Sequence, residues 1–329
     1  MNERLTRKGK YQVDIEFENI LQEMNKALRP INDNLSSTAH EGDLPPLIFF
    51  CFAPRTGSTL ISQVLARTGE FSYVSNYVAR FWEAPYLSMI IEKKLDLRQL
   101  NEHKIYPGML KSDYGTTFHF AEPHEFGFFW NKLLPNNETH FIEPGQVPEQ
   151  QATWVRQQIN AMRRVYNKPF FIKNGIIGYN PAVIKQLFPD AWFVVIQRDW
   201  AFVAQSIFLG RLKIFGNTKE WLSLRPKEYK KIRASSASEF EEIAGQIKYI
   251  YRNIEDGIKG SENRVLRLSY EAFCANPKKL IDKIFSLISY TPGNDYPKLI
   301  PDKLANNNHI KVDPGQFKQI EKAINKIAG

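Results

Sequence analysis

The sequence has little cysteine, and its two cysteines, Cys51 and Cys274, lie far apart in apolar runs. This pattern argues against a disulfide framework and suits a reducing compartment. Long apolar runs are also missing, because the longest, residues 47–53, is far too short to span a bilayer. Residues 1–10 are polar and basic, with no apolar stretch behind them, which argues against a secretory signal. We therefore expect a cytoplasmic protein with no membrane partner.

Runs of Lys or Arg are absent too, although the chain carries a net charge of +9 at pH 7. A nucleic-acid-binding tail is therefore disfavoured. The basic surplus suits an anionic partner such as a multiply charged nucleotide or an acidic polysaccharide, but a merely soluble basic protein would have it as well. Internal repeats and low-complexity tracts are not seen, and 43% hydrophobic residues with 24% charged residues are ordinary globular values.

Short apolar runs alternate with helical patterns along much of the chain. Residues 47–53, closed by Pro54, predict a fully buried strand, and a loop and a helix ending near Gly69 follow it. Further strands are predicted at 170–172, 192–196 and 264–268, and helices at 153–165, 181–187, 200–210 and 280–288. This alternation predicts an α/β fold with a P-loop-type central parallel β-sheet flanked by helices. In such sheets, ligands bind at the carboxyl ends of the strands.

Two regions lie outside this alternation. Residues 13–28 have the apolar spacing of an amphipathic helix, so we interpret 1–44 as an N-terminal helix and connector. Residues 70–165 are rich in Phe, Trp and Tyr with turn residues between them, and we expect helices and loops that form one wall of a cleft. Both regions are assigned to a single domain over 1–329.

The loop after the first predicted strand has the composition of an anion site. A helix amino terminus offers unpaired N–H groups, Gly57 lets the backbone approach an anion, and Arg55 adds a bidentate cation. Hydroxyl donors are supplied by Thr56, Ser58 and Thr59. A nucleoside-triphosphate loop would need a second glycine and a Gly-Lys pair, which are missing, so a kinase or ATPase is disfavoured. A plain strand-to-helix turn capped by Ser58 is the structural alternative.

The segment Ala53-Pro54-Arg55-Thr56-Gly57-Ser58-Thr59-Leu60 resembles the 5′-phosphosulfate loop of sulfotransferases that use 3′-phosphoadenosine 5′-phosphosulfate (PAPS). Cytosolic members usually carry Lys where this chain has Arg55, and Arg there is similar to the tyrosylprotein and bacterial carbohydrate branches. The resemblance implies transfer of a sulfuryl group from PAPS to a carbohydrate or other small alcohol. It also implies 3′,5′-ADP as the product, no metal, and an acceptor-binding role for residues 70–165.

Two further segments resemble the same family. In Ile196-Gln197-Arg198-Asp199 and the following helix, the resemblance implies that Arg198 and Ser206 bind the 3′-phosphate, although Trp200 stands where the family usually has Pro. A local Arg198–Asp199 ion pair is the alternative. The run Leu268-Ser269-Tyr270-Glu271-Ala272-Phe273 resembles the Tyr-Glu-Asp segment, which implies that Tyr270 lies beside the adenine. The three matches cover roughly residues 47–69, 168–211 and 263–289.

Sulfuryl transfer needs cations for the moving group and a base for the acceptor proton. Arg55 is predicted to act at the bridging oxygen, with Lys173 as a second cation or, alternatively, a solvated strand end. The base stays open between Glu83, since several branches place a glutamate in this general region, and His124, since cytosolic members use histidine. The other histidines, His40, His103, His140 and His309, are expected to be solvated or satisfied.

The segment around His124 allows two other interpretations. A sugar could stack on Trp130 and donate hydroxyl hydrogens to Glu122 and Glu125. The same glutamates with His124 are metal-ligand types, but His119 lies five residues away and no second histidine follows at helical spacing, so a metal site is disfavoured.

Three functions therefore remain open from the sequence. A sulfotransferase would bind PAPS without metal, a P-loop kinase or phosphotransferase would bind ATP with magnesium, and an inactive nucleotide-binding protein would bind 3′,5′-ADP without turnover. Neither the acceptor nor the oligomeric state can be assigned from these residues.

Overall fold

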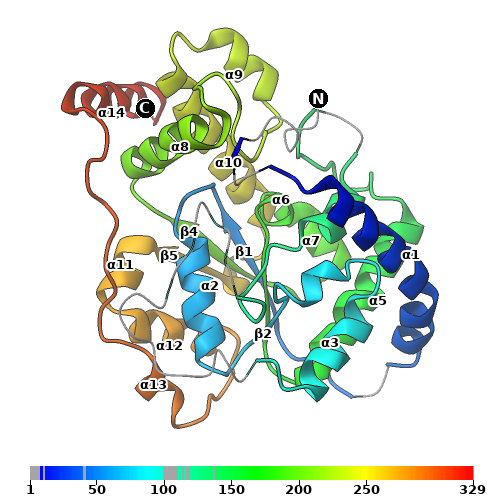
Figure 1. Cartoon of the computed structure of the whole chain (residues 1–329). Coiled ribbons are helices and arrows are strands. Elements are labelled where there is room, and N and C mark those ends of the chain that lie inside the picture. Colours follow the sequence, from blue (N-terminus) through cyan, green and yellow to red (C-terminus); the bar gives the residue numbers. More distant parts are fainter. Residues whose placement is uncertain are drawn as a thin grey trace.

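A five-stranded parallel sheet forms the centre of the protein (Figure 1). The computed structural model describes residues 8–9, 12–39, 42–98, 110, 112, 115, 117, 119–135 and 138–328. Its strands are β1 (Leu47–Phe52), β2 (Ser72–Tyr73), β3 (Phe170–Lys173), β4 (Trp192–Gln197) and β5 (Val265–Ser269), in the spatial order β2-β3-β1-β4-β5. The predicted α/β fold with a central parallel sheet is confirmed.

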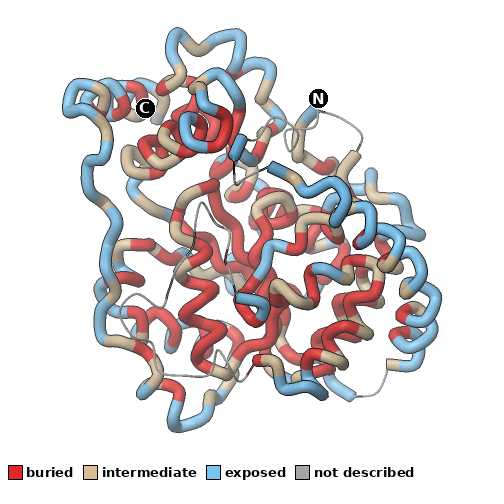
Figure 2. The backbone as a smooth tube through the Cα atoms, viewed as in Figure 1, coloured by how far each residue is buried: buried red, intermediate tan, exposed pale blue. Residues whose placement is uncertain are grey.

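The register aligns the carboxyl ends of three neighbouring strands. Phe52 at the end of β1 pairs with Ile196 in β4, and Gln197 at the end of β4 pairs with Ser269 at the end of β5. Every residue of β1 and β3 is buried, which explains their unbroken apolar runs (Figure 2). The loops after β1, β4 and β5 therefore start at one edge of the sheet.

Helices cover both faces of the sheet (Figure 1). Alternate residues of β1 face opposite layers, because Ile48 and Phe50 join one apolar cluster whereas Phe49 and Cys51 join the other. The Ile48 side is covered by α2 (Ser58–Arg67), α11 (Tyr270–Ala275) and α12 (Pro277–Leu287). The opposite side is covered by α5 (Glu149–Tyr166), α7 (Pro181–Leu187), α8 (Trp200–Phe215) and α10 (Glu239–Ile258).

The remaining helices pack around these layers. They are α1 (Ile15–Ser37), α3 (Pro85–Lys94), α4 (Gly127–Trp130), α6 (Gly175–Gly178), α9 (Tyr229–Ser235), α13 (Tyr296–Leu299) and α14 (Pro314–Ala328). Short 3-10 helices occur at η3 (Val78–Arg80), η5 (Asn131–Leu133) and η6 (Glu262–Arg264). Among the described residues, no helix is both long and apolar enough to cross a membrane.

Two local predictions needed correction. The first helix runs on to Ser37, so part of the predicted connector is helical. Tertiary hydrogen bonds support the added turns, because buried Asn32 donates to Gln158 of α5 at 2.9 Å and Gln158 donates to Ser36 at 2.9 Å. The two-residue strand β2 was not predicted, and it pairs with β3 at one edge of the sheet.

Candidate active site

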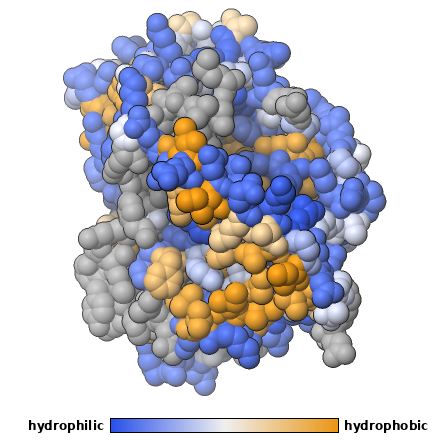
Figure 3. Space-filling view, turned by 45° about the vertical axis from the view of Figure 1, so that its right-hand side comes forward, coloured by the Kyte–Doolittle hydropathy of each residue, from blue (hydrophilic) through white to orange (hydrophobic). Residues whose placement is uncertain are grey.

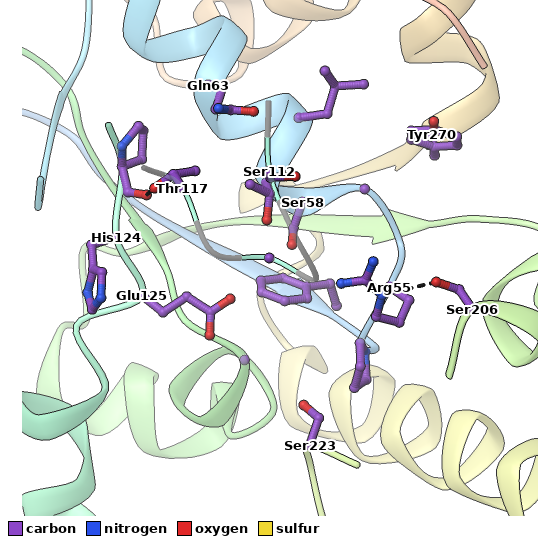
Figure 4. Close-up of a pocket in the computed structure, with 18 of the residues that line it drawn as sticks. Arg55, Ser58, Gln63, Ser112, Thr117, His124, Glu125, Ser206, Ser223 and Tyr270 are labelled. Carbon is purple, nitrogen blue, oxygen red and sulfur yellow. Dashed lines mark hydrogen bonds between the residues drawn. The ribbon is translucent and has the colours of Figure 1, made fainter. Parts of the chain in front are cut away.

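One large pocket opens where the loops after β1, β4 and β5 meet, with a volume of about 1340 Å³. Its lining includes Arg55, Gly57, Ser58 and Thr59 from the first loop, Arg198 and Ser206 from the β4–α8 unit, Tyr270 from α11, and His124 and Glu125 (Figure 4). The structure thus brings together most of the predicted site residues. Thr56, Glu83 and Lys173 do not line this pocket.

The first loop presents the amino terminus of α2 to the pocket. Gly57 is the N-cap of the helix, with a φ of +88°, and has no side chain that could cap α2. The N–H groups of its first turn are therefore open to an anion. The hydroxyl of Thr56 is buried and donates to the carbonyl of Ala53 at 2.9 Å, which stabilises the loop.

Gly57 and Tyr270 explain how the first and third motifs meet. A Cβ atom at Gly57 would overlap the aromatic ring of Tyr270, so only glycine permits this approach. The guanidinium carbon of Arg198 lies 4.6 Å from the centroid of the same ring. The three segments that resemble the sulfotransferase motifs are therefore in direct contact.

Arg55, Arg198 and Ser206 form a connected polar group. Arg55 Nε donates to Ser206 Oγ at 3.0 Å (Figure 4), and Arg198 Nη1 donates to the carbonyl of Arg55 at 3.0 Å. Arg198 also donates to Asn308 Oδ1 at 2.8 Å and to the carbonyl of Asn307 at 3.1 Å. Two guanidinium groups at one edge of the sheet create a strongly anion-attracting surface.

Lys173, at the end of β3, is buried and holds Glu125 at the pocket wall. Its ammonium lies 3.0 Å from Glu125 Oε1, and the side chain of Asn174 donates to the carbonyl of Glu125 at 2.7 Å. Glu125 extends into the pocket opposite Arg55 and Ser58 (Figure 4). Sequence reasoning treated Glu125 as a sugar contact and missed this pair, since the two residues come from distant parts of the chain.

His124 lines the pocket in a neutral form. Its Nδ1 accepts the N–H of Phe126 at 2.8 Å, so the proton of the neutral ring is on Nε2. Desolvation by the surrounding protein lowers the pKa of His124 to about 4, although the residue is exposed to the cavity. The Glu125 carboxylate opposes part of this shift. In this arrangement neither ring nitrogen offers a free lone pair to an acceptor proton.

Glu83 points to a different environment. Its carboxylate pairs with Lys132 and, at 3.0 Å, with Arg29 of α1, and its N–H donates to Asn25 Oδ1 at 2.8 Å. The neighbouring Trp82 lines the pocket instead. Through these contacts, Glu83 joins α1 to the segment after η3.

Glu122 and Trp130, which the sequence offered as possible sugar or metal contacts, have partners elsewhere in the fold. Glu122 is buried and pairs with Arg67 of α2. Trp130 is buried against Phe49 and Phe129 and offers no stacking face to the pocket. Within the described part of the chain, no three His, Cys, Asp or Glu side chains are grouped to hold a metal ion. His40 and His103 lie outside the described residues.

The chain is similar to solved sulfotransferase structures, and the one with a TM-score of 0.50 shows the same fold. The sulfotransferase STF1 of Mycobacterium tuberculosis superposes with a TM-score of 0.50 at 12% identity, covering 92% of this chain and 81% of that one. The sulfotransferase STF9 of Mycobacterium avium gives 0.47 at 12% identity, with 87% and 77% covered. A sulfotransferase of Alicyclobacillus acidocaldarius gives 0.43 at 11% identity, with 87% and 93% covered.

Sequence comparison identifies the family. A search of curated proteins found no match. The model of the sulfotransferase family matches residues 46–291, which include the first loop, the β4–α8 unit and α11. With three quarters of its length matched and the three motifs meeting in one pocket, the chain belongs to the sulfotransferase family.

Proposed function

We propose that this protein transfers a sulfuryl group from PAPS to an acceptor hydroxyl and releases 3′,5′-ADP. The observation that carries the proposal is the convergence of the α2 amino terminus, Arg55 and Arg198 on one pocket. Such an arrangement suits a ligand with two separate anionic groups. The pocket volume of about 1340 Å³ exceeds the roughly 300–1,000 Å³ of a single-ligand site, so donor and acceptor have room together.

The donor takes the cationic side of the pocket in this proposal. The first turn of α2, with Ser58 and Thr59, binds the 5′-phosphosulfate, and Arg198 with Ser206 binds the 3′-phosphate. Tyr270 lies beside the adenine. Arg198 exchanges its contacts with Asn307 and Asn308 for phosphate oxygens, which form stronger charge-assisted hydrogen bonds.

The chemical step is an in-line displacement at sulfur. The acceptor oxygen forms a bond to sulfur while the bond from sulfur to the bridging phosphate oxygen breaks. Arg55 stabilises the charge that develops on the leaving phosphate. Glu125 takes the acceptor proton, because it faces the pocket and Lys173 fixes its carboxylate.

The donor assignment is tested by ligand binding. Calorimetry of the full chain is expected to give tighter binding of 3′,5′-ADP than of 5′-AMP or ATP. Arg198→Ala should weaken 3′,5′-ADP binding by about 10- to 100-fold, because it removes charged hydrogen bonds. Binding of 5′-AMP should change much less.

Arg252→Ala is the matched control, since Arg252 is an exposed arginine on α10, away from the pocket lining. Equal affinities of wild type and Arg198→Ala for 3′,5′-ADP would refute the 3′-phosphate assignment. Tight 3′,5′-ADP binding with no transfer from PAPS to any hydroxyl would instead support an inactive nucleotide-binding protein.

A further inference from the structure

The pocket continues beyond the anion-binding residues into a chamber whose lining combines apolar side chains with polar ones, which include Glu18, Arg80, Asn131 and Ser223. This chamber is bounded by α1, the segment after η3, α4, the carboxyl-terminal half of α8 and the loop that follows α8. Its apolar lining is formed by Leu21, Trp82, Phe128, Leu209, Leu222 and Leu224. One face of α8 lines both the anion-binding part of the pocket and the chamber. Gln205 and Ser206 lie in the first part, and Leu209 follows one turn later in the second.

The walls of the chamber are held in place by contacts behind them. Trp82 and Phe128 stack with ring centroids 4.5 Å apart. Gln246 of α10 donates to the carbonyls of Leu222 at 3.0 Å and Leu224 at 2.8 Å. Ser223, between the two leucines, has a φ of +71°, a strained conformation that these hydrogen bonds maintain. The leucine wall is therefore pre-formed.

Two glycines keep the chamber open. A Cβ atom at Gly127 would have no other atom within 4 Å, so this lining position faces empty space. At Gly175 a Cβ atom would sit 3.6 Å from Leu224 Cδ1 and 3.8 Å from Phe52 Cε2. Both positions would accept a methyl group, and the absence of side chains enlarges the space next to Glu125.

Apolar surface also extends outward from the chamber along α1. Phe17 and Ile20 are 44% and 58% exposed, and they share a helix face with Leu21 of the lining. Figure 3 shows hydrophobic residues gathered on the face of the molecule that α1 and α3 form in Figure 1. An exposed apolar strip that continues into a pocket is typical of a site for an apolar ligand.

We propose that the acceptor is an amphiphilic alcohol, with its hydroxyl at Glu125 and a long apolar body in the chamber and along α1. This inference rests on the proposed sulfuryl transfer and names its substrate class. The side chains of Leu222, Leu224 and Trp82 offer a sugar no hydrogen-bond acceptors, whereas an alkyl chain can pack against them. Apolar burial instead favours binding in proportion to chain length.

The test uses a homologous series of linear primary alcohols, from butanol to dodecanol, beside glucose and trehalose. Binding to the complex with 3′,5′-ADP is measured by calorimetry, and transfer from PAPS is measured as kcat/KM. We expect both affinity and kcat/KM to rise by about two- to fourfold per methylene until the chamber is filled. The two sugars should fall at least roughly 100-fold below decanol, the sum of several such steps.

Variants locate the effect in the chamber. Gly127→Leu places a side chain in open space, so it should shorten the preferred alcohol by two or more carbons while leaving the affinity for 3′,5′-ADP unchanged. Ile20→Ser should lower kcat/KM for dodecanol more than for butanol. Ile31→Ser is the matched control, because Ile31 is similarly exposed on α1, at 53%, but lies almost three turns beyond Leu21 of the lining, whereas Ile20 is next to it.

The outcomes separate the acceptor class from the reaction. Transfer to sugars with no dependence on alcohol length would overturn the amphiphilic acceptor and leave sulfuryl transfer intact. An unchanged length preference in Gly127→Leu would also overturn it. Alcohols that bind with the expected length dependence but receive no sulfuryl group would support the chamber and count against the proposed reaction.

Discussion

At the scale of single residues, the contacts of Glu83, His124 and Glu125 bear on which of them could take the proton from the acceptor hydroxyl. His124 uses Nδ1 to accept the N–H of Phe126, and Glu83 is paired with Arg29 and Lys132 outside the pocket. Glu125 faces the cavity with its carboxylate 3.0 Å from the Lys173 ammonium. The geometry therefore favours Glu125 over both residues predicted from the sequence.

Glu125→Gln is expected to lower kcat by about 100-fold or more, the usual contribution of a general base. Its affinity for 3′,5′-ADP should stay within twofold of wild type, because the anion-binding residues are untouched. Steady-state kinetics with PAPS and calorimetry measure the two effects. Glu83→Gln and His124→Asn serve as matched controls, and a loss of turnover in His124→Asn as large as in Glu125→Gln would return the base role to His124.

At the scale of elements, the junction between β1 and α2 depends on one glycine. Gly57 has a φ of +88°, and the Tyr270 ring from α11 fills the place where its Cβ would be. Arg198 at the end of β4 lies against the same ring. Three strand-to-helix junctions are thus packed together through a position that has no side chain.

Gly57→Ala is therefore expected to destabilise the protein by about 2 kcal/mol, from backbone strain and overpacking together. It should also weaken 3′,5′-ADP binding, because Tyr270 must move away from Arg198. Urea unfolding and calorimetry measure these effects. Gly127→Ala is the control, with negative φ and open space around it, and should cost far less. The stability loss should shrink in a Tyr270→Ala background, and an equal loss there would contradict the steric explanation.

At the scale of the whole molecule, a partly buried histidine, His140, is expected to make stability depend on pH. His140 Nδ1 accepts the backbone N–H of Arg225 at 2.9 Å, and the backbone N–H of His140 donates to the carbonyl of Arg225 at 2.9 Å. These two hydrogen bonds tie the segment after η5 to the loop before α9. Burial, with a smaller effect of the Arg225 guanidinium, lowers the pKa of His140 to about 4. The folded protein therefore keeps this ring neutral.

Between pH 6.5 and 4 the unfolded chain binds a proton at His140 that the folded chain does not bind. The free energy of unfolding should fall as the pH is lowered through this range, by up to about 1.4 kcal/mol per pH unit from this group. His140→Asn keeps a hydrogen-bond acceptor but cannot be protonated, so its decline should be shallower, with stability near wild type at pH 7.5. Urea unfolding at pH 5 and 7.5 measures the difference, and parallel declines in the two proteins would exclude His140 as the cause.

Much of the sheet could be predicted because it is encoded locally. Strands that are buried on both faces need continuous apolar runs, and β1, β3 and β4 each have one, whereas the edge strand β5 keeps Val265, Leu266 and Leu268 around an exposed Arg267. The strand β2 has two residues and no such signal. The last turns of α1 could not be predicted either, because they are supported by hydrogen bonds from Gln158 of α5, which is distant in the sequence.

The pocket positions of the residues proposed to bind the donor could be predicted from the sequence for a related reason. Arg198 follows β4 directly, Arg55 and Gly57 lie in the short loop after β1, and parallel strands bring such positions to one edge of the sheet. The acceptor side follows no such rule. Whether Glu83 or Glu125 faces the pocket depends on which cation lies near it, and those cations come from α1, η5 and β3. Sequence alone therefore decides the sheet and the motifs at its edge. Tertiary packing decides which carboxylate faces the pocket and the shape of the chamber, because both depend on contacts between segments far apart in the chain.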